Sequence, residues 1–150
     1  MTKLKPGFAF WLVCDRGFAV GLMTHHVERI GHVVWLARPF FDAPPTAEDV
    51  GRIEEWRWPI FFPLGAAVRR KIVTPIGVFP IPAGMEAFPM MRSRAGKGSG
   101  KTAWNLVKFV DGSSRSCGPT SDSSLPIYSV VNDTRLKEML VSDWAPEQQW

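Results

Sequence analysis

The sequence lacks most features that would assign it to a membrane, secreted or disulfide-stabilised class. No apolar run approaches the roughly 18 residues that a membrane-spanning helix needs, so we expect no membrane segment. The two cysteines, Cys14 and Cys117, are too few for a disulfide framework, and we expect both to be reduced. The apolar stretch at residues 8–13 is too short for a secretory signal, and Arg16 soon follows it. These features favour a cytoplasmic protein.

Catalytic signatures are also missing. Serines are frequent in residues 113–124, but no nucleophile elbow or orienting base accompanies them. The acidic pairs Glu48/Asp49 and Glu54/Glu55 fall on a predicted short helix, where they serve capping and solubility. We therefore predict a protein that is not an enzyme and that needs no cofactor.

The candidate metal ligands are three histidines, His25, His26 and His32. Neighbouring strand residues point to opposite faces, so His25 and His26 cannot hold one ion together within a strand. A hairpin could bring His32 beside one of them, with Cys14 as a further ligand, and such a set would suit zinc. The spacing matches no tight metal motif, so we predict exposed turn histidines and no metal site.

Length and composition describe a globular chain with many turns. A chain of 150 residues with 45% hydrophobic and 21% charged residues can bury a core without disulfides or metals. Thirteen prolines and thirteen glycines are too many for a helical bundle and are normal for a strand-and-turn protein. We predict a single domain over residues 1–150, with a folded body at 1–141 and a frayed tail at 142–150, of which Trp144 or Trp150 could dock on the body.

Three aromatic and branched runs, at residues 8–13, 17–23 and 31–36, predict an antiparallel meander. Thr46 can cap a helix over residues 46–55, and Asp133 or Thr134 can cap a second one at 134–141. The fold class we predict is α+β and mostly β: a curled antiparallel sheet or an open barrel with two short helices. Further extended segments are predicted at residues 60–64, 67–73, 76–81, 88–92, 102–110 and 125–131, with loops at 93–101 and 112–124.

Residues 95–102 read Ala-Gly-Lys-Gly-Ser-Gly-Lys-Thr and resemble a relaxed phosphate-binding loop. Such a loop must leave a buried strand and enter a helix, whose N-terminus helps to bind the phosphate. Here the residues that follow alternate like a strand, and no helix separates them from residues 106–111. We interpret the segment as a basic hairpin loop that does not bind nucleotides.

Basic residues nevertheless gather around this loop. With Trp104 and Phe88 nearby, they could bind a phosphate backbone and stack on bases, which makes a small nucleic-acid-binding domain the alternative function. The net charge of +4 and the pI of about 9.4 favour anionic partners only modestly. The basic residues concerned are Arg92, Arg94, Lys97, Lys101 and Lys108.

An aromatic connector suggests a protein interface. Trp56, Arg57 and Trp58 precede Pro59 in a segment that we expect to be a rigid turn. Exposed Trp and Arg are the usual anchors of protein interfaces, although burial in the core is an equally good interpretation. Arg92 and Arg94 are the candidate charged rim of this patch.

Several short segments resemble the immunity protein 26 family of bacterial polymorphic toxin systems. They are the strand Phe18-Ala19-Val20-Gly21-Leu22, the later strand that ends in Phe40-Phe41, the proline-led helix start at residues 44–50, Thr74-Pro75-Ile76-Gly77, and Phe88-Pro89-Met90-Met91-Arg92. The similarity covers roughly residues 5–110. The chain has Val73, Thr74 and Pro75 where a Trp is expected before the Ile-Gly segment.

The resemblance implies a non-catalytic protein that neutralises a cognate bacterial toxin by binding it directly. Its partner would then be that toxin, with Trp56, Arg57, Trp58, Arg92 and Arg94 as candidate contact residues. The identity of the toxin and the oligomeric state of the chain do not follow from the sequence.

Overall fold

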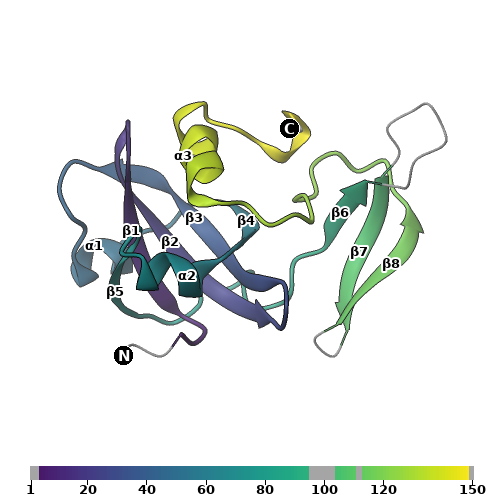
Figure 1. Cartoon of the computed structure of the whole chain (residues 1–150), viewed down its shortest axis with the longest axis horizontal. Coiled ribbons are helices and arrows are strands. Elements are labelled where there is room, and N and C mark those ends of the chain that lie inside the picture. Colours follow the sequence, from purple (N-terminus) through teal and green to yellow (C-terminus); the bar gives the residue numbers. More distant parts are fainter. Residues whose placement is uncertain (1–3, 95–103, 111–112, 149–150) are drawn as a thin grey trace.

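Two antiparallel sheets lie side by side in the computed structural model, which describes residues 4–94, 104–110 and 113–148 (Figure 1). The larger sheet has the order β4-β3-β2-β1-β5 and the smaller one β6-β7-β8. The strands are β1 (Phe8–Cys14), β2 (Gly17–Val27), β3 (Gly31–Phe41), β4 (Trp56–Phe62), β5 (Thr74–Val78), β6 (Met91–Arg94), β7 (Trp104–Val110) and β8 (Ser113–Pro119). The helical elements are α1 (Ala47–Gly51), α2 (Leu64–Arg69), α3 (Asp133–Val141) and the 3₁₀ turn η1 (Pro146–Gln148).

The predicted α+β, mostly β class is confirmed. The predicted meander is β1-β2-β3, which pairs in sequence order across two hairpins. Neither sheet closes into a barrel, and α2 is a helix that the sequence analysis did not expect. Among the described residues, no helix is both long enough and apolar enough to cross a bilayer.

Both faces of the larger sheet are buried, which explains the continuous apolar runs of its strands. One face packs against α2 and α3, through Leu64 and Leu136 among others. The other face packs against Val50 of α1 and against Met85 in the long connection between β5 and β6. A third apolar cluster, with Phe61 and Val107, joins the two sheets.

The capping prediction holds for α1. Thr46 Oγ1 accepts a hydrogen bond from the Asp49 amide (3.2 Å), and Asp49 Oδ2 accepts one from the Thr46 amide (2.9 Å). The helix ends at Gly51 and not near residue 55. The cap of α3 is Asn132, whose Oδ1 accepts from the Arg135 amide at 2.8 Å, and neither Asp133 nor Thr134.

Four local predictions are wrong. Residues 64–69 form α2 where the end of one extended segment (60–64) and the start of another (67–73) were expected, because Leu64 and Ala67 recur at helical spacing toward the core. Residues 113–119 form β8 where a loop was expected. The strand is exposed on both faces, so its sequence has no apolar alternation that would indicate a strand. Residues 125–131 make only two isolated bridges, Arg92–Ile127 and Phe61–Val130. The supposed Trp56–Pro59 turn is the start of β4, an edge strand that tolerates Pro59.

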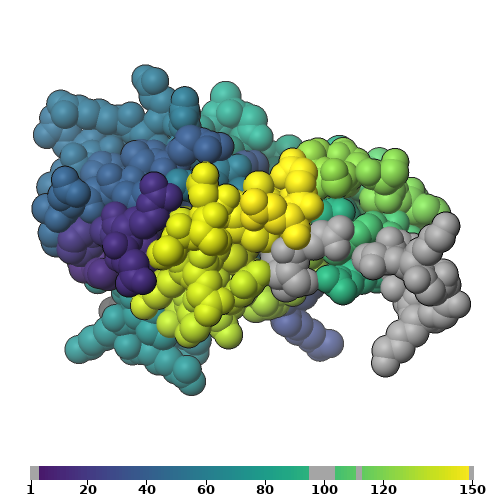
Figure 2. Space-filling view, turned by 90° about the horizontal axis from the view of Figure 1, so that it is seen from above, coloured from purple at the N-terminus to yellow at the C-terminus, as the bar shows by residue number. Residues whose placement is uncertain are grey.

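The residues after α3 are docked and do not form a frayed tail over 142–148. Trp144 is 6% exposed, and Pro146 is also buried. Trp144 therefore docks on the body, which is the alternative that the sequence analysis left open. Trp150 lies outside the described residues. Figure 2 shows this segment (yellow) covering the junction between the larger sheet and the green strands of the smaller one. The packed body therefore extends beyond residue 141.

Three contacts hold this segment, and we call them the C-terminal clasp. Trp58 Nε1 donates to the Trp144 carbonyl at 2.9 Å, and the two rings meet edge to face at 5.2 Å. Arg57 Nη1 donates to Asp143 Oδ1 at 2.6 Å. Arg92 Nη2 donates to the Pro146 carbonyl at 2.6 Å. Because Trp58 and Arg57 belong to β4 and Arg92 to β6, the clasp ties both sheets to one segment.

The Gly21→Ala substitution should destabilise the fold by about 1–3 kcal/mol through overpacking. A Cβ at Gly21 would clash with the ring of Phe10, which is fully buried, so the ring or the strand must shift. The control is Gly51→Ala at the end of α1, where a Cβ meets no atom within 4 Å and stability should hold or rise slightly. Urea unfolding of both variants measures this, and an unchanged midpoint for Gly21→Ala would contradict the packing of Phe10.

The Trp58→Phe substitution should cost about 2 kcal/mol in unfolding free energy, because it leaves the carbonyl of buried Trp144 without its donor. Trp11→Phe is the matched control, since Trp11 is partly exposed and packs edge-on against Phe18 in the same sheet. Limited proteolysis should cut the segment after α3 sooner in Trp58→Phe than in Trp11→Phe. Equal melting temperatures and equal cleavage in the two variants would mean that the clasp does not hold the segment.

Candidate functional site

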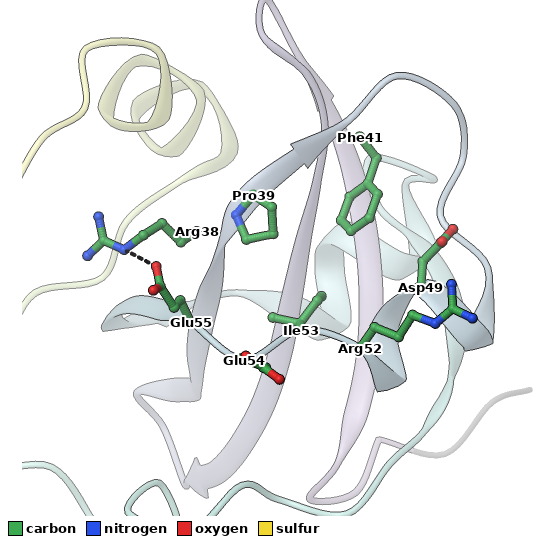
Figure 3. A pocket seen from close by; sticks show the side chains of 8 residues that line it. All are labelled: Arg38, Pro39, Phe41, Asp49, Arg52, Ile53, Glu54 and Glu55. Carbon is green, nitrogen blue, oxygen red and sulfur yellow. Dashed lines mark ion pairs between the residues drawn. The ribbon is translucent and has the colours of Figure 1, made fainter.

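A groove beside α1 is a clear hollow on the larger sheet (Figure 3). It holds about 480 Å³ and lies between the end of β3 and the segment that runs from α1 into β4. Pro39, Phe41 and Ile53 supply its apolar floor. The Thr46 cap fixes where α1 begins, and the pairing of Arg38 with Glu55 (N···O 2.9 Å) closes the segment back onto β3.

The rim of this groove carries charges of both signs. Arg38 Nε lies 3.6 Å from Glu55 Oε2, and Arg52 Nη2 lies 2.5 Å from Glu48 Oε1 one helical turn away. All four side chains are more than half exposed, so each pair contributes at most about 1 kcal/mol. These charges can therefore be rearranged by a partner at little cost. An apolar floor inside a polar rim is the usual anatomy of a protein-binding surface.

The predicted aromatic patch is not a surface in this structure. Trp58 is 6% exposed, and the Arg57 side chain is also 6% exposed because it lies against Phe40 and Asp143. Trp56 packs partly into the core beneath α1, with a buried Nε1 that has no hydrogen-bond partner among the described residues. The sequence left core packing and interface open as equal interpretations, and the structure places Trp58 in the core.

The Arg57–Asp143 pair also affects the acidity of the clasp. The hydrogen bond from Arg57, followed by its positive charge, lowers the pKa of Asp143 below its usual value. Because the folded-state pKa is the lower one, this contribution to stability is present above the unfolded-state pKa and is lost as pH falls through the folded-state pKa. Arg57 therefore works in the packing of the fold.

The two predicted rim arginines are placed differently from each other. Arg92 is 2% exposed, lies 4.1 Å from the Trp104 ring centre and donates to Pro146, so it is a packing residue. Arg94 is exposed, and its guanidinium group lies 5.5 Å from the centre of the same Trp104 ring. Both belong to β6 of the smaller sheet, whereas Trp56–Trp58 belong to β4 of the larger one, and the C-terminal clasp contacts both strands.

Of the remaining basic candidates, Lys108 is exposed on β7. Lys97 and Lys101 lie outside the described residues, as does the whole phosphate-loop-like segment 95–102. Its flanks, however, are the antiparallel neighbours β6 and β7, with Arg94 paired to Trp104. The residues around the segment thus follow a strand-to-strand pattern, which is the context expected for a hairpin loop.

The histidines are only partly brought together. His26 and His32 are directly paired across β2 and β3, with ring centres 4.7 Å apart. His25 points elsewhere: its Nε2 donates to the Glu86 carbonyl (2.8 Å), its Nδ1 accepts from Thr24 (2.9 Å), and its ring lies 4.1 Å from that of Phe88. Cys14 lies at the opposite end of β2. Within the described ranges, no three His, Cys, Asp or Glu side chains form a metal-binding group.

Burial makes two of these histidines weak bases. Burial lowers the pKa of His25 despite its bond to Glu86. Burial and then the neighbouring His26 lower the pKa of His32 to about 4. The buried Nδ1 of His32 has no partner within the described part of the chain. Both rings are therefore expected to be neutral at pH 7, and they serve to pack β2 against β3 and against the β5–β6 connection.

Sequence reasoning missed the groove. Its floor comes from Phe41 and Ile53, which are separated by a helix in the chain, so no local sequence pattern shows that they line one groove. The signal that was available is the proline-led helix start after Phe40-Phe41, which places a short helix next to the end of an apolar strand.

The cysteines are unpaired, with Cys14 in β1 and Cys117 in β8.

Comparison with protein-family models, with curated proteins and with solved structures finds no significant match to this chain. The groove and the surfaces around it are therefore interpreted from their own geometry.

Lowering the pH from 6.5 to 4.5 should reduce the free energy of unfolding by about 1–2 kcal/mol, a range discounted for the partial exposure of the rings. Folding lowers the pKa of His32 from its usual value to about 4. Between pH 6.5 and 4.5 the unfolded chain therefore binds more protons than the folded chain, and the free energy of unfolding decreases as the pH is lowered. His32→Phe should flatten the dependence, whereas Glu28→Gln, an exposed neighbour in the same hairpin, should keep it. Urea titrations at several pH values measure it, and an equal slope in His32→Phe would rule out His32 as the source.

Proposed function

We propose that this chain is a bacterial immunity protein that neutralises a cognate toxin in the cytoplasm by direct protein–protein binding, without catalysis or a cofactor. The observation that carries the proposal is the α1 groove, whose apolar floor and charged rim suit an inserted side chain of a protein partner. The groove offers no nucleophile beside a base, so binding is the chemistry that its residues support.

The resemblance to the immunity protein 26 family supports the same function. Its segments fall on β2, on the end of β3, on the start of α1, on β5, and on residues 88–92, where β6 begins. Two of these segments flank the groove: Phe40-Phe41 ends β3, and residues 44–50 lead into and form most of α1. The proposal thus places the toxin on a surface built by the segments that carry the resemblance, and not on Trp56–Trp58.

A nucleic-acid-binding function is the second candidate, because Arg94, Lys108 and Arg115 are exposed on the smaller sheet. The aromatic ring that shares their face is Trp104, and it is 8% exposed and lies close to two arginines. Base stacking therefore has no open ring there. This makes protein binding the better-supported function.

The decisive experiment is a test of neutralisation against candidate toxin domains encoded by the genes that neighbour the gene of this chain. Co-expression should restore growth, and the purified pair should bind with 1:1 stoichiometry in calorimetry. Ile53→Ala should weaken binding about tenfold or more, since it removes the centre of the groove floor. Val78→Ala is the control: Val78 is 49% exposed on the opposite edge of the same sheet.

Thermal melts of both variants establish that each is folded. Growth arrest that persists on co-expression, with no complex formed, would refute the immunity function. A complex that Ile53→Ala leaves intact would move the interface away from the groove. Tight binding of single-stranded DNA that weakens steeply with salt would support the second candidate instead.

A further inference from the structure

The smaller sheet holds the whole positive excess of the protein. The chain has 18 basic and 14 acidic residues, a net charge of +4. Strands β6, β7 and β8 contain four of the basic residues and no acidic one, so the rest of the chain is electrically balanced. A charge segregated in this way on one small sheet sets a local field that selects an anionic partner.

Strand register places the exposed cations on one face. Alternate residues of β7 share a face, which puts Leu106, Lys108 and Val110 together with Trp104. Arg94 is directly opposite Trp104, and Arg115 is directly opposite Lys108. We call the exposed residues Arg94, Lys108, Val110 and Arg115, together with the partly buried Leu106, the cationic face.

The Lys108–Arg115 pair is unfavourable for folding alone. Like charges directly opposite in an antiparallel pair destabilise a sheet. Both side chains are exposed, and neither forms an ion pair with any described residue. Such a pair destabilises the free protein. An acidic group bound between the two cations would remove this repulsion.

Strand β8 also offers a free edge beside this face. It is the outermost strand of the smaller sheet (Figure 1), and no described segment pairs with its outer side. All of its residues except Gly118 are exposed, and five of the seven are small (three serines, Cys117 and Gly118), so few bulky side chains block approach. Pairing with β8 of a second copy would bring cationic strands together, which disfavours self-association.

We propose that β8 and the cationic face dock an extended acidic segment of a partner protein, which adds a strand to the smaller sheet. Backbone hydrogen bonds to β8 supply affinity, while Lys108 and Arg115 select acidic side chains at alternate positions. Val110, 43% exposed, offers an apolar contact beside them. This inference rests on the proposed function, in which the partner is the toxin, and it adds a second contact away from the α1 groove.

A protein segment fits this face better than a nucleic acid. The ring of Trp104 is buried beside Arg92 and Arg94 and cannot stack on a base. The face also alternates cations with the aliphatic side chains of Leu106 and Val110, a pattern that matches an amphipathic strand better than a phosphate backbone.

The test uses a fluorescein-labelled peptide of alternating Glu and Thr, with a Lys-Thr peptide and oligo-dT as comparison probes. Arg115→Glu should weaken binding of the Glu-Thr peptide about tenfold or more. The same variant should melt at an equal or higher temperature, because it turns the like-charge pair with Lys108 into an opposite-charge pair. Arg70→Glu is the control, with the same change in net charge on an exposed residue after α2.

Hydrogen exchange gives the structural readout: amides of residues 113–119 should become protected when the Glu-Thr peptide binds. Equal weakening by Arg70→Glu, no protection in β8, or tighter binding of oligo-dT with the same sensitivity to Arg115→Glu would each overturn the proposal. With the toxin itself, Arg115→Glu should weaken the complex about tenfold. If the chain neutralises the toxin and Arg115→Glu binds that toxin with full affinity, the cationic face is not a docking site, and the immunity function still holds. Peptide binding as expected, without toxin neutralisation, would refute the function and leave the face standing.

Discussion

The hydrogen bond from Trp58 to the Trp144 carbonyl is the contact on which the arrangement of the two sheets depends most. It is 2.9 Å long, it is buried, and it sits where the two rings also meet edge to face. In such a buried site water does not replace the bond from the indole N–H to the carbonyl, so losing the donor costs the full desolvation of the carbonyl. Once Trp144 is fixed, Pro146 falls within reach of Arg92 on the smaller sheet.

This arrangement explains why the aromatic and arginine side chains that look most like interface anchors are packing residues. Trp58, Arg57 and Arg92 each satisfy or balance a group on residues 143–146. The partner that they bind is the chain's own C-terminal segment. Two surfaces that stay open to another molecule are the α1 groove on the larger sheet and the cationic face on the smaller one, and these two differ in character. One is apolar with mixed charges, and the other carries charge of a single sign.

The sequence alone predicted the elements whose signals are local. The meander followed from three apolar runs, and α1 followed from Thr46, which forms the expected cap. Strand β7 followed from its alternation. Three further features depend on contacts between distant residues. Strand β8 has a polar sequence and forms because it pairs with β7, and residues 142–148 are ordered by side chains of β4 and β6. The groove was missed for the same reason, because Phe41 and Ile53 meet only after α1 has turned the chain back.

The clasp also fixes an order of events during synthesis. Its contacts join residues that are 86, 86 and 54 positions apart in the chain. Contacts of such high sequence separation form late, because a long loop must close before any of them can form. The strands of the meander can pair with one another soon after they leave the ribosome, whereas Trp58 and Arg92 must wait for residues 144–146. Until then, the three donors of the clasp are exposed to water and the apolar surface beneath the segment is uncovered, which is the state in which a chaperone would meet the nascent chain.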